Sequence, residues 1–268
     1  MKTFRLVGAA LLAVLMCVSF TSCSSDDDNT ITNEDGTISN GKKLVEVKYS
    51  HGDYSDVTTF SYDNNGHLIS EYCDGYICQY SWAENTIVES YDNTTFSLVD
   101  GLIRTGKNST MSYDYDFAYN SDKQIIAINR YYNKKIGTKY TFTWEDGKIT
   151  KIVEDGATQT EVKNITYSTQ TCKGYNPLIG SLVFDWYISY AHPELFGVRL
   201  NHLPAKIVQK SSPKMQGAVT YDEVSEITYK FDNNGYISSC SIKETGIEKW
   251  GDEEREYTDS YTISFTWQ

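Results

Sequence analysis

The chain has 268 residues, with 36 acidic and 24 basic side chains and a formal net charge of −12. This acidic balance argues against nucleic acid as a partner, because phosphate binding needs clustered lysine and arginine. Aromatic residues make up 14% of the chain and include 22 tyrosines against 4 prolines, which favours β structure over disorder. The length suits one large β domain or two small domains.

The first 22 residues have the pattern of a removable signal peptide. Lys2 and Arg5 form a basic start, and residues 6–20 form an apolar stretch too short to span a membrane comfortably. Small residues then lead to Cys23, a pattern that resembles the lipobox of bacterial lipoproteins, in which this cysteine is acylated. We therefore expect lipid attachment at Cys23, and the alternative is an ordinary secretory signal cut nearby.

Residues 23–41 predict a flexible acidic tether, because low hydrophobicity and like charge keep such a segment extended. An acidic run directly after a lipidated cysteine resembles the surface-export signal of Bacteroidetes lipoproteins, and it fits a plain spacer equally well. In both cases we expect the protein in the cell envelope. Its lipid would anchor it to the outer membrane, on the periplasmic or the surface face.

Residues 42–268 predict a single all-β domain, because one pattern recurs along them. An aromatic-x-aromatic pair is followed by a polar turn and then by an aliphatic restart, which is typical of antiparallel hairpins. Roughly fourteen to sixteen strands in this antiparallel meander must curl, close or stack, since open edges invite aggregation. The pattern does not choose between a closed barrel and an open curved sheet. The pairs begin at Phe60, Tyr80, Phe117, Phe142, Tyr229 and Phe265, and at Phe96 the second member is Leu98 instead of an aromatic residue.

Four cysteines remain in this domain, namely Cys73, Cys78, Cys172 and Cys240. Their pairing cannot be chosen from the sequence. A two-residue hairpin turn at Asp74-Gly75 would pair Cys73 with Tyr76 and place the thiols of Cys73 and Cys78 diagonally, too far apart for a disulfide. We therefore favour two buried thiols at these positions.

One segment, about 176–192, departs from the strand pattern and predicts a short helical insert. Asn176 offers an N-cap and Pro177 a first helical position, and apolar residues at 178, 182 and 186 share one helix face. We expect this helix to dock on an open end or in the interior of the β structure. Trp186 would then be buried, or it would line a ligand mouth together with His192 and His202.

Motifs for known chemistry are missing from the sequence, so we assign no catalytic residue, no cofactor site and no metal site. His192 and His202 flank a loop with Glu194, but we interpret them as structural or exposed rather than as metal ligands. The two Asp-Asn-Asn-Gly segments that start at Asp63 and Asp232 lack the alternating ligands of a calcium loop, and they predict hairpin turns.

The composition of the two strand faces separates a membrane barrel from a water-exposed one. The apolar face of the predicted strands is built largely of tyrosine and includes Arg130 and Asp259, whereas the opposite face carries small hydroxylated residues. A charge at the bilayer midplane costs about 2–4 kcal/mol, so the tyrosine face would make a poor lipid surface. It would make a good semi-polar interior, and we expect a water-exposed domain.

The lipobox, the closing Phe265-Thr-Trp267 and the Asn176-Pro-Leu segment followed by Leu203-Pro-x-x-Ile207 together resemble an uncharacterised Bacteroidetes family of lipoproteins. That family, a domain of unknown function, is described as having a porin-like fold. The resemblance implies a β-barrel-like fold and transfers no catalytic residue. We therefore expect a non-enzymatic binding or structural module, with the membrane as partner through its lipid anchor and a glycan or other envelope component as ligand. The alternatives are an envelope glycan hydrolase and an outer-membrane channel.

Overall fold

The computed structural model describes residues 41–110, 112–184, 187–215, 218–251 and 253–268. Within these ranges no helix combines the length and the apolar character needed to cross a bilayer. The first eight strands are β1 (Leu44–His51), β2 (Tyr54–Tyr62), β3 (Leu68–Cys73), β4 (Tyr76–Ala83), β5 (Thr86–Glu89), β6 (Thr94–Val99), β7 (Leu102–Asn108) and β8 (Tyr113–Tyr119). The next eight are β9 (Ile125–Tyr132), β10 (Lys135–Glu145), β11 (Lys148–Asp155), β12 (Gln159–Thr171), β13 (His202–Pro213), β14 (Thr220–Phe231), β15 (Ile237–Trp250) and β16 (Glu253–Trp267).

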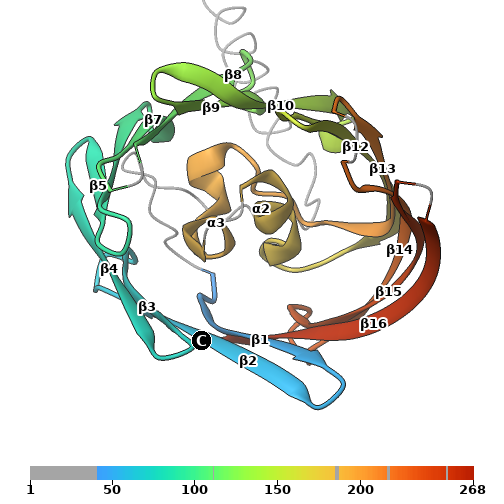
Figure 1. Cartoon of the computed structure of the whole chain (residues 1–268). Coiled ribbons are helices and arrows are strands. Elements are labelled where there is room, and N and C mark those ends of the chain that lie inside the picture. The colour runs from blue at the N-terminus through green and yellow to red at the C-terminus, as the bar shows by residue number, and fades with distance from the viewer. Residues whose placement is uncertain (1–40, 111, 185–186, 216–217, 252) are drawn as a thin grey trace, which may run out of the picture.

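These sixteen described strands form a closed antiparallel barrel in which each strand pairs with its neighbours in sequence (Figure 1). The barrel closes between β1 and β16, where Lys48 lies opposite Ser264 and Leu44 opposite Trp267. The predicted antiparallel, barrel-like meander is confirmed, and the choice that the sequence leaves open is decided in favour of a closed barrel.

The aromatic repeat marks the even-numbered strands and faces the interior. Its first member is at most 6% exposed in every even-numbered strand: Phe60, Tyr80, Phe96, Phe117, Phe142, Ile165, Ile227 and Phe265. Strand β14 differs from the predicted repeat, because Ile227 and Tyr229 hold the inward positions and Phe231 is 37% exposed. The repeat in β14 therefore lies two residues earlier than the sequence predicts, and Phe231 is the last residue of the strand.

A ring of side-chain hydrogen bonds connects the two strands of the hairpins at the end opposite the hairpin turn. Near the end of an even-numbered strand, a tyrosine hydroxyl or a tryptophan N–H donates to a backbone carbonyl near the start of the preceding strand, over 2.6–2.9 Å. Seven hairpins carry this bond, and in β5–β6 Leu98 occupies the corresponding place. The seven bonds are Tyr62 to Leu44, Trp82 to Leu68, Tyr119 to Ile103, Trp144 to Ile125, Tyr167 to Ile149, Tyr229 to Pro204 and Trp267 to Ile237.

The substitution Trp144→Phe tests one of these bonds. It removes the N–H donor to the Ile125 carbonyl and keeps an aromatic ring at the position. We expect the free energy of unfolding to fall by about 1–2 kcal/mol, because a partly buried carbonyl loses its partner. Urea denaturation measures the change, and Trp250→Phe is the control, since Trp250 is 69% exposed. Equal effects of the two substitutions would contradict a stabilising role for the bond.

The helical insert enters the barrel from the end where β12 stops and β13 starts, which we call the insert end. It consists of α2 (Pro177–Val183), α3 (Tyr187–Ala191) and the 3-10 turn η1 (Pro193–Phe196), and both helices lie within the ring of strands (Figure 1). The predicted cap is confirmed, because the side chain of Asn176 accepts from the Leu178 N–H. The single predicted helix is instead two short helices, since Phe184 ends α2 in an extended conformation.

The insert packs tightly against itself and against the barrel wall. An added Cβ at Gly180 would lie 2.0 Å from the Ser189 carbonyl oxygen, so α2 and α3 touch through a glycine. The rings of Phe184 and Phe196 lie 5.4 and 5.9 Å from that of Phe117 on β8. The insert therefore belongs to the hydrophobic core of the barrel, as the sequence predicts.

The outer surface of the barrel is charged in the middle of its strands. Lys206 on β13 lies opposite Glu226 on β14, which lies opposite Lys243 on β15, and all three are exposed. Asp114 and Asp116 are likewise exposed on β8, where they alternate with the half-buried Tyr113 and the buried Tyr115 and Phe117. The apolar face of the strands therefore points inward and the polar face outward.

Candidate functional site

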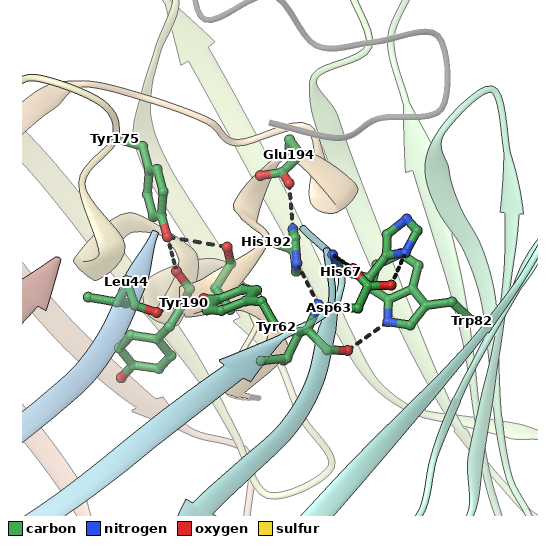
Figure 2. Close-up of polar contacts among 11 residues, drawn as sticks. Leu44, Tyr62, Asp63, His67, Trp82, Tyr175, Tyr190, His192 and Glu194 are labelled. Carbon is green, nitrogen blue, oxygen red and sulfur yellow. Dashed lines mark hydrogen bonds and ion pairs between the residues drawn. The ribbon is translucent and has the colours of Figure 1, made fainter. Parts of the chain in front are cut away.

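The sequence-predicted residue His192 lies at the insert end, in a polar cluster that joins the insert to the barrel wall (Figure 2). Its ring is buried, and Nε2 accepts a hydrogen bond from the Leu68 N–H on β3 over 3.2 Å. Because a backbone N–H can only donate, the ring proton is on Nδ1, which donates to Glu194 Oε1 over 2.7 Å. Both ring nitrogens are therefore used within the fold.

Aromatic rings enclose His192. Tyr62 and Trp82 approach it edge-on at 6.0 and 5.5 Å, and His67 stacks on Trp82 at 4.5 Å. The Tyr175 hydroxyl donates to the carbonyls of Tyr190 and Ala191 at the end of α3 (Figure 2). Burial, and secondarily the nearby Glu194, raises the pKa of the Tyr62 hydroxyl far above its ordinary value, so it remains a hydrogen-bond donor. The cluster anchors the insert, and the buried position of His192 does not fit the predicted ligand mouth.

His202, another sequence-predicted site residue, makes its ring contact with a different residue of the barrel wall. His202 begins β13, its ring meets Tyr167 edge-on, and its pKa is lowered by burial and by the nearby Lys148. Trp186 and Cys23 lie outside the described residues. In the described part of the chain, no group of three or more histidine, cysteine or acidic side chains is arranged to hold a metal ion.

The two Asp-Asn-Asn-Gly segments form hairpin turns. The Asp63 carboxylate accepts from the backbone N–H groups of Asn65 and His67, and Asp232 accepts in the same way from Asn234 and Tyr236. Both aspartates are thus occupied by their own turns. The predicted turn assignment is confirmed.

The candidate site lies in the lower-numbered half of the barrel, toward the end opposite the insert end, where the β3–β4 and β5–β6 turns are. A cavity of about 330 Å³ is bounded there by β3, β4, the β5–β6 turn and α3. The predicted register is confirmed, since Cys73 pairs with Tyr76 and Glu71 with Cys78. The four described cysteines are free thiols, and Cys73 is half-buried rather than buried.

One carboxylate of the cavity accepts hydrogen bonds from neighbouring groups of the protein itself. Glu89 is 4% exposed, and it accepts from the backbone N–H groups of Tyr91 and Asp92 and from the Cys78 thiol. It therefore holds the β5–β6 turn in place. Burial, followed by the hydrogen bond to Glu89, raises the pKa of Cys78 to about 12, so this cysteine stays protonated near neutral pH.

The second carboxyl group, Glu71, is 8% exposed and accepts one hydrogen bond from the Tyr80 hydroxyl over 2.9 Å. Burial raises its pKa to about 7; the bond from Tyr80 opposes the shift and the charge of Glu89 adds to it. Glu71 therefore titrates near neutral pH inside a cavity, which is typical of functional carboxyl groups and also occurs in structural networks.

This shift makes stability depend on pH. The raised pKa in the folded state means that the fold binds the proton more tightly than the unfolded chain does, so stability falls as the pH rises from about 4.5 to about 7. We expect Glu71→Gln to remove this loss, which is on the order of 3 kcal/mol at 1.36 kcal/mol per pKa unit. Urea midpoints at about pH 5 and pH 8 measure it. A profile equally steep in the variant would contradict the assignment.

The sequence alone does not indicate this cavity. Glu71, Cys78 and Glu89 look like ordinary members of alternating strands, and only strand register brings them together. The available signal was an acidic residue at an inward position of β3 and again of β5, the two strands that flank β4. The same pattern recurs beyond the cavity, where inward tyrosines donate to inward glutamates, as in the pairs Tyr140–Glu154, Tyr257–Glu223 and Tyr261–Glu244.

Comparisons with known proteins support the architecture. No family model matches the chain, and neither does any curated protein. Among solved structures, the chain is similar to a porin-like protein from Bacteroides uniformis, with a TM-score of 0.62, 16% identity, and coverage of 85% of this chain and 98% of the other. It is also similar to a porin-like protein from Bacteroides vulgatus, with a TM-score of 0.54, 14% identity, and coverage of 84% and 99%. At these identities the likeness concerns the fold alone.

Proposed function

We propose that this chain is a lipid-anchored barrel of the cell envelope that binds a small ligand, without catalysis, in the cavity formed by β3, β4, the β5–β6 turn and α3. One observation carries the proposal. The insert fills the barrel at one end, whereas the cavity of about 330 Å³ includes among its lining residues Tyr76 and Tyr91, which are 61% and 60% exposed. Concave sites of this size that combine aromatic walls with convergent polar groups are typical of ligand binding.

The channel alternative has less support. The interior is occupied by buried side chains of the insert, among them Ile179, Ile188 and Phe196. The outward charges on Lys206, Glu226 and Lys243 would each be costly against lipid, at about 2–4 kcal/mol for a lysine near the midplane. We therefore propose a water-exposed barrel, held at the membrane by its N-terminal lipid.

The hydrolase alternative rests on Glu71, whose pKa of about 7 suits a general acid. Glycoside cleavage needs a second carboxyl group that is free to act as base or nucleophile. Glu89 is the neighbouring buried carboxyl group, and three donors within the fold already occupy it. Binding without catalysis is thus the better supported function.

A thermal-shift screen tests the binding proposal. The purified protein is screened against neutral glycans, lipid head groups and ammonium compounds, beside the variant Cys73→Phe, which places a large ring in the cavity wall. A ligand selective for the native state raises the melting temperature. We expect at least one compound to stabilise the parent protein and not the variant. The proposal fails if no compound acts, or if every active compound stabilises both proteins equally.

The anchor has its own test. Cells that express the protein are labelled with an alkyne palmitate, and Cys23→Ala is compared with Cys17→Ala. Incorporation should disappear in the first variant and persist in the second. The reverse pattern would refute lipid attachment at Cys23.

A further inference from the structure

We infer that the ligand of this cavity is an organic cation, an ammonium group held among tyrosine rings and carboxyl groups. The inference rests on the proposed binding function and specifies its ligand class. Two independent features of the cavity carry it, namely the aromatic character of its walls and the sign of the charges around them.

The aromatic walls come from three parts of the fold. Tyr76 and Tyr80 lie on β4, Tyr91 lies in the β5–β6 turn, and Tyr187 begins α3. The rings of Tyr76 and Tyr91 meet edge-to-face at 5.9 Å at the mouth. The electron-rich faces of such rings attract cations, and cages of aromatic residues are a recurring solution for quaternary ammonium ligands.

The charges of the cavity have a single sign. Its ten lining residues include four carboxyl groups, those of Glu71, Asp74, Glu89 and Asp92, and none of the ten is lysine, arginine or histidine. Some carboxyl groups elsewhere in the described barrel do have basic partners, as Asp155 has Lys214 and Asp232 has Lys42. An unbalanced negative cavity with apolar walls would attract a ligand cation and repel a carboxylate or a phosphate.

Binding of a cation would be linked to the titration of Glu71. This side chain faces Tyr80 and Cys78 on β4, Glu89 on β5 and Cys73 on its own strand. Tyr187 and Asp92 line the same cavity. Each of these neighbouring side chains is neutral or negatively charged. A positive ligand favours the ionised carboxylate. The affinity for the cation should therefore increase as the pH rises through about 7, which is the pKa of Glu71 in the unliganded protein.

Titration calorimetry of the purified protein with choline and with tetramethylammonium tests the inference. The matched neutral probe is the carbon isostere of choline, in which a quaternary carbon replaces the nitrogen. We expect both cations to bind and the isostere to bind at least about tenfold more weakly, which corresponds to 1.4 kcal/mol. Choline should bind several-fold more tightly at about pH 8 than at about pH 6, and Glu71→Gln should abolish that difference.

The variant Tyr76→Leu locates the site, with Tyr72→Leu as its matched control. Tyr76 lines the cavity, whereas Tyr72 is 48% exposed on the neighbouring strand, next to Cys73 and on the opposite, outward face. We expect the first variant to weaken choline binding roughly tenfold and the second to leave it unchanged. Equal binding of choline and its isostere, or equal effects of the two variants, would overturn the inference.

Failure of the inference and failure of the proposed function give different results. If neither cation binds but a neutral compound stabilises the parent protein and not Cys73→Phe, the cavity is a ligand site of another class. If no compound of any class acts in that way, both proposals fall.

Discussion

The substitution Phe196→Ala should lower the free energy of unfolding by about 3–5 kcal/mol, the cost of deleting a fully buried aromatic side chain. Phe196 ends η1, is 0% exposed, and packs its ring at 5.3 Å from Phe184 and 5.9 Å from Phe117 on the barrel wall. The expected effect is large because Phe196 is fully buried and its loss would leave a cavity between the insert and the wall. Urea denaturation followed by tryptophan fluorescence measures it.

The control for this experiment is Phe231→Ala. Phe231 has the same side chain but is 37% exposed at the end of β14, so its loss should cost less than about 1 kcal/mol. If Phe196→Ala were no more destabilising than Phe231→Ala, the insert would not be part of the core of the barrel.

Among the glycine-to-alanine substitutions at turns, Gly197→Ala should lower the free energy of unfolding the most. Gly197 follows η1 with a φ of 66°, and an added Cβ would lie 2.1 Å from the Lys123 carbonyl oxygen in the β8–β9 turn. A left-handed conformation costs an L residue about 1–2 kcal/mol, and overpacking adds about 1–3 kcal/mol. We expect a total loss of about 3 kcal/mol or more.

Gly147→Ala separates the two contributions. Gly147 has a similar φ of 73°, but an added Cβ there would have no heavy atom within 4 Å beyond its chain neighbours. Its substitution should therefore cost only the conformational part, about 1–2 kcal/mol. Equal losses in the two variants would mean that the insert does not press against the β8–β9 turn.

Local signals in the sequence were sufficient for the barrel and its turns. The alternation of Phe60-Ser-Tyr62 and its counterparts reports which face is buried, and Asp-Asn-Asn-Gly at Asp63 reports a turn whose carboxylate caps its own backbone. Both follow from neighbours in the chain. The N-cap at Asn176 was predictable for the same reason, because its partner is the N–H of Leu178, two residues on.

Features that depend on distant residues could not be predicted in this way. No residue near His192 in the chain indicates that its ring would meet the Leu68 N–H, which lies 124 residues away, so a ligand mouth was a reasonable expectation for an isolated histidine. The close packing of Gly180 in α2 against Ser189 in α3 is a tertiary contact between the two short helices, and no local pattern predicts it. The cavity requires β3, the β5–β6 turn and α3 at once, and no local pattern joins them.

The barrel is filled at the insert end and accessible at the cavity. The reactivity of the protein's cysteines can distinguish these two regions. Cys73 is half-buried in the cavity wall, whereas Cys172 and Cys240 are 6% and 0% exposed near the insert end. The native protein is treated with a maleimide, and the modification of each cysteine is followed by peptide mass spectrometry relative to its rate in the urea-unfolded chain. We expect Cys73 to react within roughly tenfold of its unfolded rate, while Cys172 and Cys240 are protected by several orders of magnitude, as groups that become accessible only when the core unfolds. Native labelling of Cys172 or Cys240 as fast as that of Cys73 would contradict this expectation.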